Sequence, residues 1–430
     1  MAILRVNVRL QSPLLAGDPF PGPYGERSVP YLPGAVLRGA LGARLVEECG
    51  HSEHNGTEGC DYAKIFGPWP PPRFSPCYPA TEGIPAPFPA TARTCKNYPG
   101  LTDLEDPKHG VWDCLFSTYL IEQRIKLGKP IQNPACSICS ADLEPIQGFY
   151  EHGLDGKRYR RRAWIRRVSR TAIDRARGTA ADEMLYTLEF ISERMATGRR
   201  GTDGHEVLRD TQLVGVVTTD EARASLLARR LGEIRRLGGD TGSGLGVVTV
   251  QVRPLRTPQS VLADESITAL SVAAKDGNGT EALEGSGLIQ RLALFNHAFR
   301  ASHGADDLWP AGSLFFTIDL LSETIWFDRG LASDVLPLDL YGASLVRSFS
   351  SARVMSGWNN ASGTMRAPRR AIAAGSVFLY RFDKAADCAK LRALLEGLSS
   401  LQSEGWGDDR ERGFGYLDIC SKFHMETGPL

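Results

Sequence analysis

The sequence has 430 residues, which is enough for two or three domains with a sizeable core. Its 50 lysines and arginines balance its 50 aspartates and glutamates, so overall charge indicates neither a polyanion nor a membrane surface as partner. The N-terminus lacks the apolar core of a signal peptide, and no stretch approaches the ~20 apolar residues of a membrane span. Nine cysteines, an odd number, do not indicate a secreted disulfide framework. We therefore expect a cytoplasmic protein with no membrane partner.

The first half begins with a strand pattern and a helix pattern. Residues 3–10 alternate apolar and polar side chains, which is typical of a half-buried strand. Pro33 opens a helical pattern that stops at Gly50. Two strands, a helix and a last strand are then predicted at 184–191, 211–218, 221–237 and 247–252. The order β-α-β-β-α-β is that of a ferredoxin-like unit.

An insertion of about 51–180 separates the first helix from the second predicted strand and fits no regular pattern. Residues 67–89 hold nine prolines, which exclude a helix or a central strand there. An irregular stretch of this length inside a compact domain requires a stabilising cross-link of its own or a binding partner. We expect a first domain over 1–255 that contains this insertion.

The second half repeats the first in a less regular form. A polar linker is predicted over 253–283, followed by a second domain over 284–430. Its predicted elements are a helix at 285–300, strands at 313–320, 341–349 and 375–382, a helix at 385–404 and a strand at 416–420. The predicted fold class is α+β, with two ferredoxin-like (RRM-like) domains in tandem and an irregular insertion in the first.

Two glycine-rich stretches, 238–246 and 405–415, each join the last helix of a half to its last strand. Phosphate-binding loops of nucleotide folds run from a strand into a helix, so the order here argues against a mononucleotide site. Glycine at this density allows another backbone to come close. The simpler alternative is a pair of tight helix-to-strand connections.

The cysteines of the insertion indicate a metal site. Cys136 and Cys139 form a C-x2-C pair, the spacing at which two thiolates bind one tetrahedral ion. We select Cys95 and His109 as the other ligands because each lies in a polar segment near a turn. The prediction is a structural Cys3His zinc site, with Cys60 or Cys114 as open alternatives for the third and fourth ligands. Small buried apolar cysteines are the other interpretation.

Residues 157–177 carry ten lysines or arginines and one aspartate, with Tyr159 and Trp164 among them. Such a run is often a solvated face, but dense positive charge is also tolerated when a polyanion lies against it. Interleaved aromatic rings can stack on bases, which favours single-stranded RNA as the partner. A second basic group, Arg366, Arg369 and Arg370, follows Trp358 in the other half.

No nucleophile-and-base motif or paired-aspartate metal motif occurs in the sequence. His51 and His54 could serve a ribonuclease as acid and base. Two histidines on an exposed loop are the simpler interpretation. We therefore predict a protein that is not an enzyme, with a metal-independent endoribonuclease as the alternative.

Several motifs together resemble the RAMP superfamily of CRISPR-associated proteins. Residues 31–41 resemble the superfamily's Pro-Gly helix start, and 60–67 resemble its Cys-x-x-Cys-x-Leu-Phe-Gly segment, with Ala63 at the second cysteine. The two glycine-rich stretches resemble its G-loops. More narrowly, the order of five further motifs resembles the Csx-ten family, a Cas-five-like subunit of type III-D effector complexes. These motifs lie at 89–96, 109–113, 136–150, 356–359 and 371–377.

The resemblance implies a non-catalytic subunit that caps the 5′ handle of the CRISPR RNA in antiviral, RNA-guided defence in the prokaryotic cytoplasm. Its implied partners are the large signature subunit and the backbone RAMP subunits, with target RNA contacted indirectly. A protein-only scaffold is a further alternative. The candidate RNA-binding residues are Arg38, Arg158, Arg160, Arg161, Arg162, Trp164, Arg166, Arg167, Arg170, Arg175, Gly242, Ser243, Gly244, Gly246, Trp358, Arg366, Arg369, Arg370, Arg410, Arg412, Gly413 and Gly415.

Overall fold

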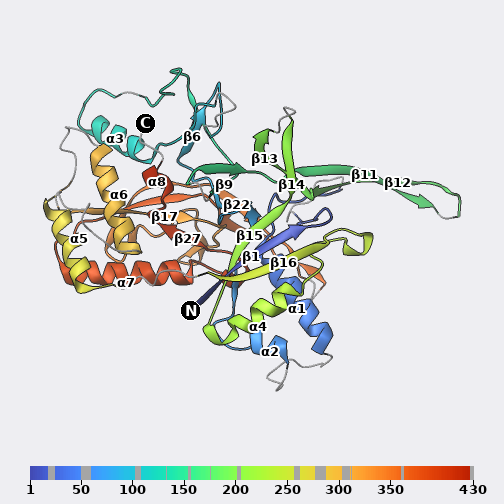
Figure 1. Ribbon diagram of the computed structural model, residues 1–430. Helices are drawn as coiled ribbons and strands as arrows, with labels where there is room; N and C mark the ends of the chain where they lie inside the picture. The colour runs from blue at the N-terminus through green and yellow to red at the C-terminus, as the bar shows by residue number, and fades with distance from the viewer. Residues whose placement is uncertain are drawn as a thin grey trace.

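The structure is a computed structural model of mixed α/β architecture with many antiparallel sheets. Figure 1 shows a sheet in each half of the chain, with helices beside both, and a long two-stranded arm that leaves the body. Within the described part of the chain, no helix is long and apolar enough to cross a membrane. The described residues are 1–17, 25–49, 60–101, 108–131, 133–153, 156–174, 176–200, 205–255, 262–276, 287–302, 310, 312–359 and 363–426.

The first sheet is built around β1, whose inward side chains are all buried. Its strand order is β16-β1-β15-β3, with β4 also paired to β15. These strands are β1 (Ala2–Leu10), β3 (Arg73–Phe74), β4 (Tyr78–Pro79), β15 (Gln212–Thr219) and β16 (Val248–Leu255). The alternation of the sequence is confirmed, because Leu4, Val6 and Val8 are buried while their neighbours are more exposed.

The prediction that 184–191 forms the second strand of this sheet is wrong. That segment belongs to β12 (Thr179–Ile191), which pairs with β11 (Ile165–Asp174) in the arm. The edge of the sheet is instead β3 and β4, from the proline-rich stretch. Proline is compatible with this edge position, since an edge strand needs fewer backbone donors.

Three helices cover the first sheet: α1 (Gly34–Cys49), α2 (Asp61–Phe66) and α4 (Glu221–Gly232). Leu37, Leu41 and Leu45 lie one helical turn apart along α1 and are buried in the first core. The predicted helix at 221–237 ends early, at Gly232. The carboxylate of Asp220 accepts the Arg223 N–H and so caps the start of α4.

The second sheet has the order β20-β21-β26-β17-β27. Its strands are β17 (Leu314–Leu320), β20 (Asp339–Leu340), β21 (Ala343–Phe349), β26 (Val377–Phe382) and β27 (Leu417–Ile419). The residues between β17 and β21, all of them described, hold no helix. The sheet is covered by α7 (Cys388–Glu404) together with α5 (Asp264–Asp276) and α6 (Leu288–Ser302), which precede it in the chain. The prediction of a linker throughout 253–283 is wrong, because α5 lies within it.

The insertion is not irregular throughout, and part of it joins the second core. Its helix α3 (Leu115–Lys126) buries Leu115, Phe116 and Tyr119 among residues of α6 and β17. The Phe116 ring stacks on Phe299 at 4.4 Å between centroids. The insertion therefore ties the two halves together as well as interrupting the first.

Besides the arm strands β11 and β12, shorter strands make up the remaining sheets. They are β2 (Gly25–Glu26), β5 (Ala86–Pro87), β6 (Ala92–Cys95), β7 (Val111–Asp113), β8 (Leu143–Pro145), β9 (Phe149–His152), β10 (Arg158–Arg161), β13 (Arg194–Arg200), β14 (Glu206–Asp210), β18 (Phe327–Asp328), β19 (Leu331–Ala332), β22 (Ala352–Met355), β23 (Trp358–Asn359), β24 (Thr364–Met365) and β25 (Arg369–Ile372). The chain's last described helix is α8 (Phe423–Glu426).

A buried histidine links α8 to both halves. The Nδ1 atom of His424 lies 2.6 Å from Oδ2 of Asp113 in β7, and its Nε2 atom lies 2.6 Å from Oδ1 of Asp319 in β17. Burial alone would lower the pKa of His424, but the two carboxylates outweigh it and raise the pKa to about 10. Both ring nitrogens therefore carry protons at neutral pH.

Candidate metal centre and nucleic-acid interface

Cys95, His109, Cys136 and Cys139 come together, and each offers one ligand atom within 4.8 Å of the others. The sulfur atoms of Cys95 and Cys139 are 3.5 Å apart, and Nδ1 of His109 lies 3.2 Å from the sulfur of Cys136. Three thiols and one imidazole form a donor set that suits a tetrahedral soft ion. This cluster could hold a metal ion, and it is the set selected from the sequence.

Backbone geometry explains how four separated residues meet. Cys95 ends β6, and His109 lies just before β7, the strand that pairs with β6. Cys136 and Cys139 sit in a tight turn in which the Ser140 N–H donates to the Cys136 carbonyl at 2.8 Å. Ser140 has φ of 56°, a left-handed conformation that closes the turn. The Tyr98 ring packs on His109 at 4.5 Å and covers one side of the cluster.

The surroundings of Cys136 favour its thiolate, the form that binds metals. Burial raises the pKa of this thiol, but N–H groups of Cys139 and Ile138 and the His109 ring donate to the sulfur. Together they lower the pKa to about 6. Cys60 and Cys114, the alternative ligands, lie outside this group. Cys60 is next to Cys49, and Cys114 immediately precedes α3.

Several arginines of the basic stretch are paired with acids distant in sequence. Arg161 is 5% exposed, and its guanidinium bonds to Glu151, so it faces the interior. On the arm, Arg166 pairs with Glu193 and Arg167 with Glu189. In the sequence these arginines look unpaired, because the carboxylates that bind Arg161, Arg166 and Arg167 lie 10 to 27 residues away along the chain.

Other residues of the stretch are more open. Arg162 and Trp164 are exposed, while Arg158 lies over the Phe423 ring and Arg160 bonds to the Gln147 carbonyl. Arg175 lies outside the described residues.

The first glycine-rich loop meets the base of the arm. Asp240 in this loop is 3.4 Å from the guanidinium of Arg170, and Leu245 packs with Leu188 and Phe190 of β12. A side chain at Gly242 or Gly244 would meet nothing within 4 Å, so this part of the loop is open to a ligand. Ser243 is also exposed. Gly246 differs, because an added Cβ would lie 1.9 Å from the Leu237 carbonyl oxygen.

The second glycine-rich loop is packed between the two halves. An added Cβ at Gly413 would lie 2.7 Å from the carbonyl oxygen of Phe74 and 3.3 Å from Gly34 at the start of α1. At Gly415 it would lie 1.8 Å from the Trp406 carbonyl oxygen. These two glycines therefore serve close packing inside the protein rather than approach of a ligand.

A pocket of about 350 Å³ lies beside the second loop. Arg412 and Phe414 of the loop face Arg366 and Arg369 from the segment around β24 and β25. The remaining lining residues supply apolar surface, hydrogen-bonding groups and one carboxylate: Ile325, Met355, Ser356, Asn359, Thr364, Ala367 and Asp409. A pocket of this kind can hold both an anion and a flat ring.

The charges of this pocket are incompletely matched. Burial lowers the pKa of Arg412, and the neighbouring Arg366 lowers it further, while Asp409 raises it. Asp409 is shared, since it lies 2.7 Å from Arg412 and 3.6 Å from Arg369, and Arg369 also lies 3.2 Å from Asp408. The buried Nε groups of Arg366 and Arg369 have no hydrogen-bond acceptor among the described residues. Three guanidinium groups and one lining carboxylate give the pocket an excess of positive charge, which suits an anionic ligand.

The remaining candidates lie apart from this pocket or at its margin. Arg370 pairs with Asp334, and Arg410 bonds to the Glu404 carbonyl. Arg38 of α1 lies over the Phe66 ring of α2. Only the backbone of Trp358 is described. His51 and His54, the residues of the ribonuclease alternative, lie outside the described residues.

Comparisons with known proteins give only weak likenesses. No protein-family profile and no curated protein matches the sequence. A chain of a type III-B Cmr-beta complex bound to cognate target RNA and AMPPnP is similar, with a TM-score of 0.41, 12% identity and coverage of 87% of this chain and 86% of that chain. A chain of a type IV-B CRISPR complex has a TM-score of 0.26 and 14% identity, covering 61% of this chain and 94% of that chain. Scores this low do not establish a shared fold.

Proposed function

We propose that this chain is a non-catalytic RNA-binding subunit of a type III CRISPR effector complex, of the III-D kind, that caps the 5′ handle of the guide RNA. The proposal rests on the pocket in which Arg366, Arg369 and Arg412 meet Phe414. Its guanidinium groups can bind phosphate oxygens, and its ring offers a stacking surface for a base. The sequence resemblance to the Csx-ten family supplies the particular RNA and the partner subunits.

The sheet orders support a further part of the proposal, that each half is a ferredoxin-like unit, the second without a helix between β17 and β21. In the first sheet the last strand β16 lies beside the first strand β1, which is followed by β15 and the edge strand β3. In the second, β27 lies beside β17, followed by β26 and β21. Both sheets thus place their strands in the sequential order four, one, three, two. The two domains would span 1–255 and 284–430 and work in the prokaryotic cytoplasm.

The Cys3His cluster would hold zinc in a structural role. Its donor set fits zinc, and its four protein ligands leave no position for a reacting water. The cluster fixes the turn between β6 and β7, near the place where the insertion joins the second half.

The first experiment identifies the RNA. The chain is expressed with its neighbouring genes, purified through a tag on this chain, and the co-purifying RNA is sequenced. RNAs that share one 5′ segment followed by variable spacers are expected. A random mixture, or no RNA, would overturn the guide-capping role.

A second experiment tests the pocket. The double variant Arg366→Ala/Arg412→Ala should bind single-stranded RNA about 10- to 100-fold more weakly at physiological salt, because two phosphate contacts are lost. The slope of log affinity against log salt should fall by about 1.4. The matched control is Arg381→Ala/Arg392→Ala, which removes two ion-paired arginines outside the pocket. Equal affinity of both variants would exclude the pocket as an RNA site.

A further inference from the structure

Cys49 and Cys60 face each other where α1 ends and α2 begins. Their sulfur atoms are 2.9 Å apart, although ten residues separate them in the sequence. A disulfide bond is about 2.05 Å long, so the two sulfurs need to approach by only about 1 Å to form one. Neither residue belongs to the Cys3His cluster.

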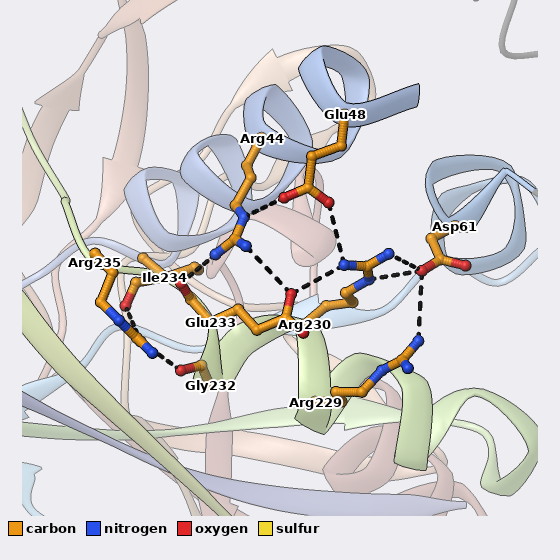
Figure 2. A network of polar contacts seen from close by, with 9 residues as sticks. All are labelled: Arg44, Glu48, Asp61, Arg229, Arg230, Gly232, Glu233, Ile234 and Arg235. Atoms are coloured by element: carbon orange, nitrogen blue, oxygen red, sulfur yellow. Dashed lines mark hydrogen bonds and ion pairs between the residues drawn. The ribbon is translucent and has the colours of Figure 1, made fainter. Parts of the chain in front are cut away.

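An ion-pair network joins the residues next to the two cysteines, and Figure 2 shows Arg230 between Glu48 and Asp61. Arg230 of α4 lies 3.1 Å from Glu48, the residue before Cys49. The same guanidinium bonds at 2.6 Å to Asp61, the residue after Cys60. Arg230 thus binds one residue on each side of the thiol pair, Glu48 before Cys49 and Asp61 after Cys60. Because the ends are already together, the effective concentration of one thiol at the other is high.

The two thiols differ in access. Cys49 is partly exposed, whereas Cys60 is 4% exposed. An oxidant in solution can reach Cys49 first, and Cys60 is then placed to complete the reaction. Of the cysteines outside both groups, Cys388 is exposed, whereas Cys77, Cys114 and Cys420 are buried, and burial raises the pKa of the Cys77 thiol to about 12. Such thiols react slowly.

We propose that Cys49 and Cys60 are an oxidative modification site that reacts with a low-molecular-weight disulfide such as glutathione disulfide. The Cys49 thiolate attacks the oxidant, forms a mixed disulfide and releases one glutathione thiolate. The Cys60 thiolate then attacks the Cys49 sulfur, forms the Cys49–Cys60 bond and releases the second glutathione. The protein loses two electrons and two protons, the oxidant gains them, and excess reduced glutathione reverses both steps. The bond would lock the end of α1 to the start of α2.

The test uses the full-length, zinc-loaded chain at defined ratios of oxidised to reduced glutathione. Trypsin cuts after Arg44 and Lys64 and nowhere between them, so one peptide carries both cysteines. After alkylation of remaining thiols, the oxidised peptide should lack two hydrogens and carry no alkyl group. The Cys60→Ser variant should instead retain glutathione on Cys49, and the Cys49→Ser variant should carry none.

A matched pair of arginine variants tests whether the ion pairs of Arg230 favour disulfide formation. Arg230→Gln should lower the equilibrium constant for disulfide formation by about 3- to 10-fold. Arg229→Gln should leave it unchanged, because Arg229 is more exposed and, among the described residues, pairs only with Asp61, at 3.7 Å.

Three outcomes would overturn the proposal. The wild-type peptide could be alkylated at both cysteines throughout the glutathione series. It could also accumulate glutathione on Cys49 without closing. Finally, both thiols of the peptide could resist alkylation without the two-hydrogen mass loss of a disulfide, and become reactive when a chelator is added. That result would identify a bound metal instead. None of these outcomes depends on whether the chain binds RNA.

Discussion

The hydroxyl of Tyr31 donates a hydrogen bond to Oε1 of Glu323 at 3.0 Å, and both side chains are buried. Tyr31 lies just before α1 in the first half, while Glu323 follows β17 in the second. Glu323 also lies 3.2 Å from Arg353 of β22. This contact, with the packing of Gly413 on Gly34, makes the two halves one continuous body at this point.

Replacing Tyr31 by phenylalanine should destabilise the chain by about 1–3 kcal/mol, because the Glu323 carboxylate stays buried but loses a hydrogen-bond donor. Urea unfolding followed by tryptophan fluorescence measures the effect. Tyr186→Phe is the control, since Tyr186 is 38% exposed on the arm. Equal stability of Tyr31→Phe and the wild type would show that the contact contributes nothing.

The buried His424 should make stability depend on pH in the alkaline range. Its folded pKa of about 10 lies above the unfolded value of about 6.5, so the folded state holds one proton more between these values. The stabilisation is full below about pH 6.5 and is lost as pH rises toward 10. The slope should approach about 1.4 kcal/mol per pH unit. Chemical unfolding at several pH values between 6.5 and 9.5 measures this slope.

His424→Gln removes the titrating group and should flatten that slope relative to the wild type. His297→Gln, on the exposed side of α6, should leave it unchanged. A wild-type slope no steeper than that of His424→Gln would mean that the imidazole is neutral when buried.

The Cys136→Ser variant should lose bound zinc and thermal stability together. The cluster has four protein ligands, and removing one thiolate should lower the content from about one ion per chain to well below one. Elemental analysis and thermal unfolding measure the two effects. Cys388→Ser, an exposed cysteine outside the cluster, is the control. Unchanged zinc in Cys136→Ser would rule out the site.

The two glycine-rich loops should respond differently to alanine. Gly413 has φ of 103° and packs on Phe74, so Gly413→Ala should destabilise the chain by roughly 1–3 kcal/mol. Gly242 has open space around it, so Gly242→Ala should change stability by less than about 0.5 kcal/mol. Thermal unfolding of both variants decides this. If Gly242→Ala lost more stability than Gly413→Ala, the first loop rather than the second would be the one that packs inside the protein.

The sequence by itself determined the long strands of the two main sheets, the helices α1, α4, α6 and α7 beside them, and the four clustered metal ligands. Alternation in 3–10 and helical spacing in 34–49 report which side chains are buried, and both elements form as predicted. The C-x2-C turn and the polar turns around Cys95 and His109 are also local features. Such patterns can be read without knowing what lies on the other side of the core.

Only the tertiary structure decided which distant partners complete these elements. The edge of the first sheet is formed by β3 and β4, although residues 184–191 have the better strand pattern. Those residues pair with β11 instead. Helix α3 joined the core of the other half, and Arg161 found Glu151 inside the protein. Burial and charge pairing depend on neighbours that are remote in sequence, and periodicity records only that a side chain is buried, not what buries it.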